Sequence, residues 1–60
     1  MSYYKEQALA KLSQVGNIVK NLELELNRNM INDARKTVER LKTKLEEAVM
    51  WANAGIARNT

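Results

Sequence analysis

The side chains best suited to chemistry gather near the two ends of this 60-residue chain. They are three aromatic rings, an amide and three cations: Tyr3, Tyr4, Lys5, Lys11, Trp51, Asn53 and Arg58. Aromatic rings stack on nucleobases, Arg and Lys hold phosphate, and an Asn amide reads a base edge or a ribose. Brought together, these side chains would form a nucleotide-binding site.

Two long helices must position these groups. Nothing obstructs a helix over about residues 3–26, which Ser2 can cap, or a second one over about residues 30–58. The one credible break is a turn at about residues 27–29, Asn-Arg-Asn, because asparagine tolerates the left-handed conformation that ends helices. Asn29 can also cap the second helix.

Apolar residues recur three and four apart in both segments, which is the spacing of a packed helix face. The predicted seam of the first helix is Tyr4, Ala8, Leu12, Val15, Val19, Leu22 and Leu26. The predicted seam of the second is Ile31, Ala34, Val38, Leu41, Leu45, Ala48 and Ala52. Gly16 interrupts the first helix at a cost of up to ~1 kcal/mol against alanine. It marks either a close approach of helices, which we favour, or room for a ligand.

Two seamed helices joined by a short link predict an all-α fold, an antiparallel two-helix hairpin that makes a single domain of residues 1–60. One seam of about six layers buries too little apolar surface to offset the ordering of about 55 residues. We therefore expect a homo-oligomeric helical bundle. Its interface is expected where apolar residues point in more than one direction among small ones: Val49, Met50, Trp51, Ala52 and Ile56.

The first residues of an antiparallel hairpin lie beside the last, so the candidate binding groups converge at one end. There the helix amino terminus adds partial positive charge. Each group also has a purely structural explanation. The tyrosines could cover the open end, and Trp51 is better explained by interface packing. Asn53 could hydrogen-bond across a subunit contact, Arg58 could complement the carboxyl end of its helix, and Lys11 could simply be solvated.

Composition excludes several classes of function. The chain has no cysteine, no histidine and two glycines, which excludes a disulfide scaffold, a Cys/His zinc site and a Gly-rich phosphate loop. No nucleophile has a recognisable base beside it, so we expect a binding protein and not an enzyme, with no metal and no cofactor. No apolar run approaches the ~20 residues of a membrane span, and no signal-peptide pattern opens the chain. These features predict a cytosolic protein.

The net charge of +3 favours anionic partners only weakly. Most basic side chains of the second helix lie between its seam positions: Arg35, Lys36, Arg40, Lys42 and Lys44. An RNA-binding patch is conceivable there. We favour a solvated helix face, with Arg35–Glu39 and Lys42–Glu46 as pairs four residues apart.

The carboxyl-terminal segment resembles a known family. Residues 45–58 read Leu-Glu-Glu-Ala-Val-Met-Trp-Ala-Asn-Ala-Gly-Ile-Ala-Arg. This segment is similar to the closing helix of the helical-hairpin domain shared by phage anti-CBASS and anti-Thoeris cyclic-nucleotide sponges. Met50-Trp51 followed by Ile56-Ala57-Arg58 is its most specific part. The hairpin architecture spans nearly the whole chain, whereas the recognisable residues span its last quarter.

The resemblance implies a helical hairpin that assembles, commonly as a hexamer, in the host bacterial cytoplasm. It implies binding of cyclic di- and trinucleotide second messengers without cleavage, so that the host effector is deprived of its signal. Arg58 would meet the phosphates of a trinucleotide around a symmetry axis. For a dinucleotide, Tyr3 or Tyr4 would stack on a base and Lys11 would hold phosphate.

Two departures from the family pattern concern these pockets. The amino terminus is short and leaves little room for the loop that some members place over the dinucleotide. Ala54 stands where some members carry a further arginine. Either departure could weaken or remove one of the two pocket classes.

Two other functions fit the sequence. A small RNA-binding hairpin dimer would use the basic residues of the second helix and depend steeply on salt. A structural coiled-coil adaptor would use the face from Val49 to Ile56 to hold a protein partner.

Overall fold

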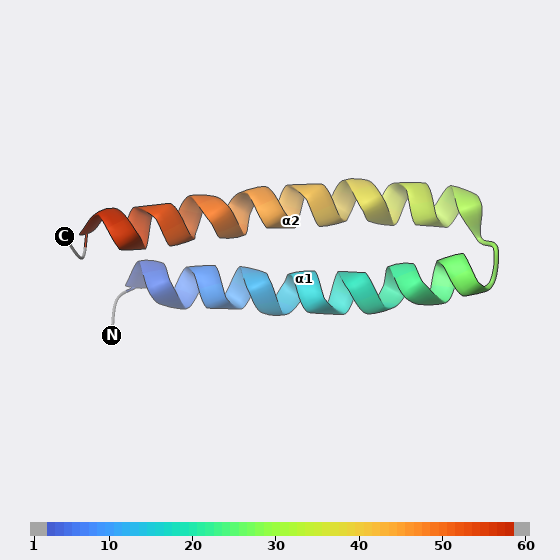
Figure 1. The fold of residues 1–60 in the computed structure, drawn as a ribbon, viewed down its shortest axis with the longest axis horizontal. Coiled ribbons are helices and arrows are strands. Elements are labelled where there is room, and N and C mark those ends of the chain that lie inside the picture. Colours follow the sequence, from blue (N-terminus) through green and yellow to red (C-terminus); the bar gives the residue numbers. More distant parts are fainter. Residues whose placement is uncertain (1–2, 59–60) are drawn as a thin grey trace.

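The computed structural model describes residues 3–58, which form an antiparallel pair of helices. Helix α1 spans Tyr3–Asn27 and helix α2 spans Ile31–Arg58. The two lie side by side over their whole length, joined by a short turn at one end (Figure 1). The predicted helical hairpin is confirmed, with α1 ending one residue later and α2 beginning one residue later than expected. Ser2 lies outside the described residues, so its capping role stays a prediction.

The turn is fixed by Asn29, which takes the left-handed conformation with φ 56°. The N–H of Met30 donates to the carbonyl of Glu25 at 2.8 Å, and the N–H of Asn29 donates to that of Leu26 at 3.1 Å. These are the paired bonds of a Schellman motif, as the tolerance of asparagine for this conformation predicted. The expected cap on α2 is wrong, because the N–H of Ala34 donates to the carbonyl of Met30. Met30, and not Asn29, therefore occupies the capping position.

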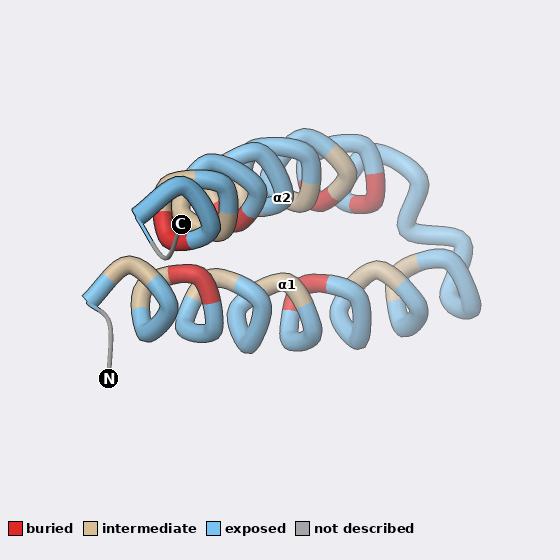
Figure 2. Tube along the Cα trace, turned by 60° about the vertical axis from the view of Figure 1, so that its left-hand side comes forward, coloured by how far each residue is buried: buried red, intermediate tan, exposed pale blue. Residues whose placement is uncertain are grey.

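The helices meet along lines rotated from the predicted seams. Residues that are buried or half-buried recur four and three apart in α1: Tyr4, Ala8, Lys11, Val15, Ile18, Leu22 and Glu25. In α2 the residues that recur in this way are Ala34, Thr37, Leu41, Lys44, Ala48, Trp51 and Gly55. Four further residues of α2 flank this line and are half-buried: Val38, Glu47, Ala52 and Ala54. Figure 2 shows the buried segments of each helix turned toward the other. These two lines are the contact between the helices.

Five predicted seam residues are wrong, because they are exposed: Leu12, Val19, Leu26, Ile31 and Leu45. The reason is that the apolar stripe of each helix is wider than the strip that one neighbouring helix can cover. Small residues decide which part of the stripe is covered, since Ala8, Ala34 and Ala48 are among the most buried residues of the chain. Longer polar side chains on the contact lines, such as Lys11 and Lys44, lay their stems along the contact and extend their charges outward.

The two glycines behave differently from each other. A Cβ added at Gly55 would lie 3.4 Å from the Cβ of Tyr4 and 3.6 Å from the backbone nitrogen of Lys5, so α1 and α2 approach each other closely here. A Cβ added at Gly16 would meet nothing within 4 Å. The predicted close approach at Gly16 is therefore wrong within this hairpin.

The rotation leaves a broad apolar stripe on one side of the hairpin. We call it the apolar face: Leu9, Leu12, Val19, Leu26, Ile31, Leu45, Val49 and Ile56, all exposed. Seven-residue spacing carries these residues along one side of each helix. A groove lined by residues of both helices places the two stripes on the same side. The opposite side, which we call the polar face, carries at the mirror positions Gln7, Gln14, Asn21, Asp33, Arg40 and Glu47.

Within residues 3–58, neither helix carries an apolar stretch long enough to cross a membrane.

Candidate functional site

Three aromatic rings meet at the open end of the hairpin. The rings of Tyr3 and Tyr4 are 5.6 Å apart between centroids and edge-on, and the ring of Tyr3 lies edge-on to Trp51 at 5.8 Å. Tyr4 and Trp51 are 5.9 Å apart and tilted by 37°. Such spacings and angles are the favourable arrangements of aromatic pairs. The first turn of α1 and the last turns of α2 therefore share one aromatic cluster, made of Tyr3, Tyr4 and Trp51.

Arg58, the last residue of α2, joins this cluster. Its Cζ lies 4.1 Å from the centroid of the Tyr4 ring, which is a cation–π contact. Its Nη1 donates to the carbonyl of Ala54 at 3.2 Å. The second contact matches the expected complement to the carboxyl end of the helix. The guanidinium is thus held over a ring, with donors left over for an anion.

Gly55 lies against the first turn of α1 beside this cluster. A Cβ added there would be in van der Waals contact with Tyr4 and with the backbone of Lys5, so the two helices are close where their rings meet. Trp51 lies one turn earlier on the same contact line of α2 and is half-buried. Tyr3, in contrast, remains 60% exposed. In this cluster Tyr4 and Trp51 are therefore half-buried, whereas the ring of Tyr3 is available to solvent.

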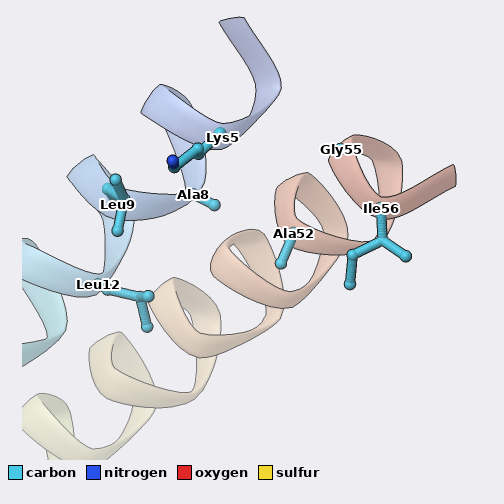
Figure 3. A pocket seen from close by; sticks show the side chains of 7 residues that line it. All are labelled: Lys5, Ala8, Leu9, Leu12, Ala52, Gly55 and Ile56. Atoms are coloured by element: carbon cyan, nitrogen blue, oxygen red, sulfur yellow. The ribbon is translucent and has the colours of Figure 1, made fainter. Parts of the chain in front are cut away.

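Lys5 lies away from the aromatic cluster, on the apolar face. It lines a groove of about 410 Å³ together with Ala8, Leu9, Leu12, Ala52, Gly55 and Ile56. Figure 3 shows these side chains coming from the first turns of α1 and the last turns of α2. The groove is apolar apart from the Lys5 ammonium. The structure therefore separates Lys5 from Tyr3, Tyr4 and Arg58, with which the sequence had grouped it.

Lys11 is committed to an ion pair inside the hairpin. Its Nζ lies 3.7 Å from Oε1 of Glu47, and Lys44 donates to the same oxygen at 3.2 Å. The hydrogen bond from Lys44 lowers the pKa of Glu47 below its ordinary value of 4.5, and the charges of Lys44 and Lys11 lower it further. Two cations thus share one carboxylate between the helices. A phosphate at Lys11 would have to compete with Glu47.

Asn53 lies on the outer side of α2. It stands two residues before Gly55, or about 200° around the helix, and so faces away from α1. It is exposed. The structure does not bring its amide to the aromatic cluster.

The predicted interface residues divide between three environments. Val49 and Ile56 are exposed on the apolar face, and Ala52 lines the groove there. Met50 is 59% exposed and lines a shallow groove on the polar side with Glu47. Trp51 belongs to the aromatic cluster.

The basic residues of α2 are partly matched by acids. Lys42 pairs with Glu39 at 3.3 Å, three residues away, in place of the expected Glu46. Lys44 pairs with Glu47. Arg40 and Lys44 share a shallow groove with Glu39. Arg35, Lys36 and Arg40 form no ion pair with the described residues 3–58.

Residues 3–58 contain no group of three or more carboxylate, imidazole or thiol side chains that could hold a metal ion.

Two residues that matter to this site were not assigned to it by the sequence analysis. Glu47 is the anion that pairs with Lys11, and Gly55 is where α2 lies against α1 beside Tyr4. Pairing α1 with α2 in antiparallel order places residue 11 near residue 48, so the sequence predicts that Glu47 lies opposite Lys11 along the length of the hairpin. The sequence does not predict on which side of α2 Glu47 lies.

We found no protein family, curated protein or solved structure that matches this chain. The functional proposal therefore rests on the chemistry of the open end and on the resemblance in residues 45–58.

Proposed function

We propose that this chain is a non-catalytic binding protein, a phage anti-defence sponge that sequesters cyclic oligonucleotide messengers in the cytoplasm of its bacterial host. One observation carries the proposal. Three aromatic rings and a guanidinium lie together at one end of the hairpin. A nucleotide-binding site needs rings that stack on bases and a cation, such as arginine, that binds phosphate.

The roles of these groups follow from their surroundings. Tyr3 offers the more exposed ring for stacking on a base. Arg58 retains donors beyond the one used on Ala54, and a bidentate contact with phosphate would be its strongest interaction. Tyr4 contacts both Tyr3 and Arg58, and Trp51 contacts Tyr3.

The grooves along residues 3–58 are open to solvent, so we expect several copies to enclose the ligand. A cyclic trinucleotide carries three phosphates in threefold arrangement, and three copies of Arg58 could each meet one. This requirement agrees with the hexamer that the resemblance implies. Affinity would then come from groups contributed by several chains.

A thermal-shift panel of cyclic di- and trinucleotides tests this proposal, because a ligand that binds only the folded form raises the melting temperature. We expect a shift with at least one messenger and recovery of that ligand intact after denaturation. Arg58→Ala should weaken binding about tenfold to hundredfold, as expected for the loss of charge-assisted hydrogen bonds. Cleavage of the ligand, or normal binding by Arg58→Ala, would contradict the proposal.

Arg28→Ala is the matched control. Arg28 is also an exposed arginine near the end of a helix, but it lies at the turn, at the opposite end of the molecule. This variant should bind as the wild type does. Equal losses in both variants would indicate a general effect of positive charge in place of a site at Arg58.

RNA binding is the weaker alternative, since Lys42 and Lys44 already pair with Glu39 and Glu47. A titration of structured RNA at two salt concentrations separates the two functions. Steep salt dependence and preference for RNA over cyclic nucleotides would favour the alternative.

A further inference from the structure

We propose that the apolar face is the self-association surface of the protein: two hairpins pack through it in a twofold, antiparallel four-helix bundle whose α1 helices cross at Gly16. The apolar face would be one of the contacts that join hairpins in the oligomer proposed above. It does not depend on the identity of the ligand. The occupant is a second copy of this chain for the four reasons that follow.

The first reason is size. The apolar face is one of the two broad sides of the hairpin, whose longer extents of 46 and 16 Å multiply to about 740 Å². Stable interfaces bury about 800 Å² on each partner. Eight large aliphatic side chains run along this side, from Ile56, 65% exposed at the open end, to Leu26 and Ile31 beside the turn. A face of this area and composition matches another of its own kind.

The second reason is the pattern of the sequence. Of the fourteen predicted seam positions, seven lie on the contact lines and five lie on the apolar face, such as Leu12, Val19 and Leu45. Each helix of a four-helix bundle touches two neighbouring helices. It therefore needs an apolar stripe wide enough to include both the contact line and the apolar face. The spacing of the apolar residues therefore fits a helix that packs against two neighbours in the assembled bundle.

The third reason is Gly16. It lies one residue from the midpoint of α1, on the same side as the apolar face, and a Cβ there would meet nothing. No contact within the hairpin accounts for a glycine in this position. A twofold axis across the middle of α1 brings Gly16 of one copy against Gly16 of the other, where the missing side chain lets the helices cross closely. The same axis sets Leu12 against Val19 of the second copy.

The fourth reason is charge. Lys5 lines the groove at the open end of the apolar face, and Glu23 lies on the same side one turn from Leu26. The proposed axis places Lys5 of one copy near Leu26 and Glu23 of the other. The groove then receives an aliphatic side chain, and the ammonium at its rim gains a carboxylate. A parallel arrangement of the two α1 helices would bring both Lys5 ammonium groups to the same end of the bundle.

This assembly leaves the aromatic cluster accessible. Tyr3 stands on the polar side of α1 by its spacing from Gln7 and Gln14, and the rings contact it there. Covering the apolar face therefore joins hairpins without closing the end where Arg58 lies.

Leu12 and Leu24 provide a matched pair of test positions. Both are leucines of α1 and both are 50% exposed, but Leu12 lies on the apolar face and Leu24 on the polar side. The mass of each variant in solution is measured by light scattering. The wild type should be at least twice the 6.9 kDa of one chain. Leu12→Glu should weaken self-association at least a hundredfold, and Leu24→Glu should behave as the wild type.

Gly16→Ala tests the crossing point. In an isolated hairpin alanine should stabilise the helix, since it is the better helix former and has open space around it. In the proposed dimer the two methyl groups meet, so self-association should weaken at least tenfold. A Gly16→Ala variant that associates more tightly overturns the crossing at Gly16.

A wild type that stays a folded single chain at high concentration, or equal effects of Leu12→Glu and Leu24→Glu, overturns the surface itself. Nucleotide-induced thermal shifts are recorded on the same samples. Failure of the ligand proposal would remove those shifts and leave the masses unchanged, so the two failures are distinguishable.

Discussion

Single residues decide how α1 and α2 fit together. Gly55 and the buried alanines Ala8, Ala34 and Ala48 let the helices approach closely. Lys11 and Lys44 lie on the same contact and pair with Glu47. Gly55 belongs to this contact beside Tyr4, so the packing of the helices and the candidate site share residues.

The ion pairs of Glu47 give the hairpin a defined acid sensitivity. Because hydrogen bonding from Lys44 lowers its folded-state pKa below 4.5, Glu47 stabilises the hairpin fully above that pH. The contribution is lost as the pH falls through the lower folded-state value. We expect Glu47→Gln to show a smaller drop in melting temperature than the wild type between about pH 7 and about pH 3, followed by circular dichroism.

Glu46→Gln is the control for this prediction. Glu46 neighbours Glu47 in sequence, is exposed, and forms no ion pair with residues 3–58 of the chain. Its variant should keep the acid sensitivity of the wild type. If both variants flatten the pH profile equally, net charge and not the contact with Lys44 is responsible.

At the scale of elements, the molecule is two helices and one turn. The turn holds because Asn29 accepts a positive φ and leaves the carbonyls of Glu25 and Leu26 satisfied. No proline or glycine is needed there. The backbone geometry of this one residue determines that α2 returns along α1.

The stability of variants at Asn29 should depend on how easily the new residue adopts the left-handed backbone conformation. Asn29→Ala is expected to lower the free energy of unfolding by about 1 kcal/mol relative to Asn29→Gly, since a Cβ without a polar group disfavours this conformation. Urea denaturation monitored by Trp51 fluorescence measures the difference. Asn27→Ala, at the last residue of α1, should be neutral or slightly stabilising. Equal stability of the Ala and Gly variants at position 29 would contradict this account of the turn.

At the scale of the whole molecule, the hairpin has two unlike broad sides. One carries eight exposed aliphatic side chains, and the other carries mainly amides and charges, with Leu24 and Met50 also exposed there. Exposed apolar surface of this extent marks an interaction site. Assembly and ligand binding are assigned to different parts of the surface, the apolar face and the open end.

Self-association makes stability depend on concentration. If folding and dimerisation are coupled, a tenfold rise in protein concentration should raise the melting temperature of the wild type by several degrees, by mass action. Leu12→Glu should melt at a temperature independent of concentration. A wild-type transition that does not move over a hundredfold range of concentration would show that the hairpin folds as a single chain.

The sequence by itself determined the two helices, the break between them and the meeting of Tyr3, Tyr4, Trp51 and Arg58 at one end. These are consequences of local propensity and of chain length, because two helices of similar length joined by a tight turn must bring their far ends together. The tolerance of asparagine for left-handed backbone was likewise a local property and identified the turn.

Only the tertiary structure decided the rotation of each helix about its axis. Spacing defines an apolar stripe, but a single neighbour covers only part of it, and the choice depends on small residues meeting across the contact. That rotation turned Leu12 and Leu45 outward, moved Lys5 to the apolar face, faced Asn53 away from α1, and brought Lys11 to Glu47. A rotation of this kind is set by packing between residues of two different helices, which no local pattern records.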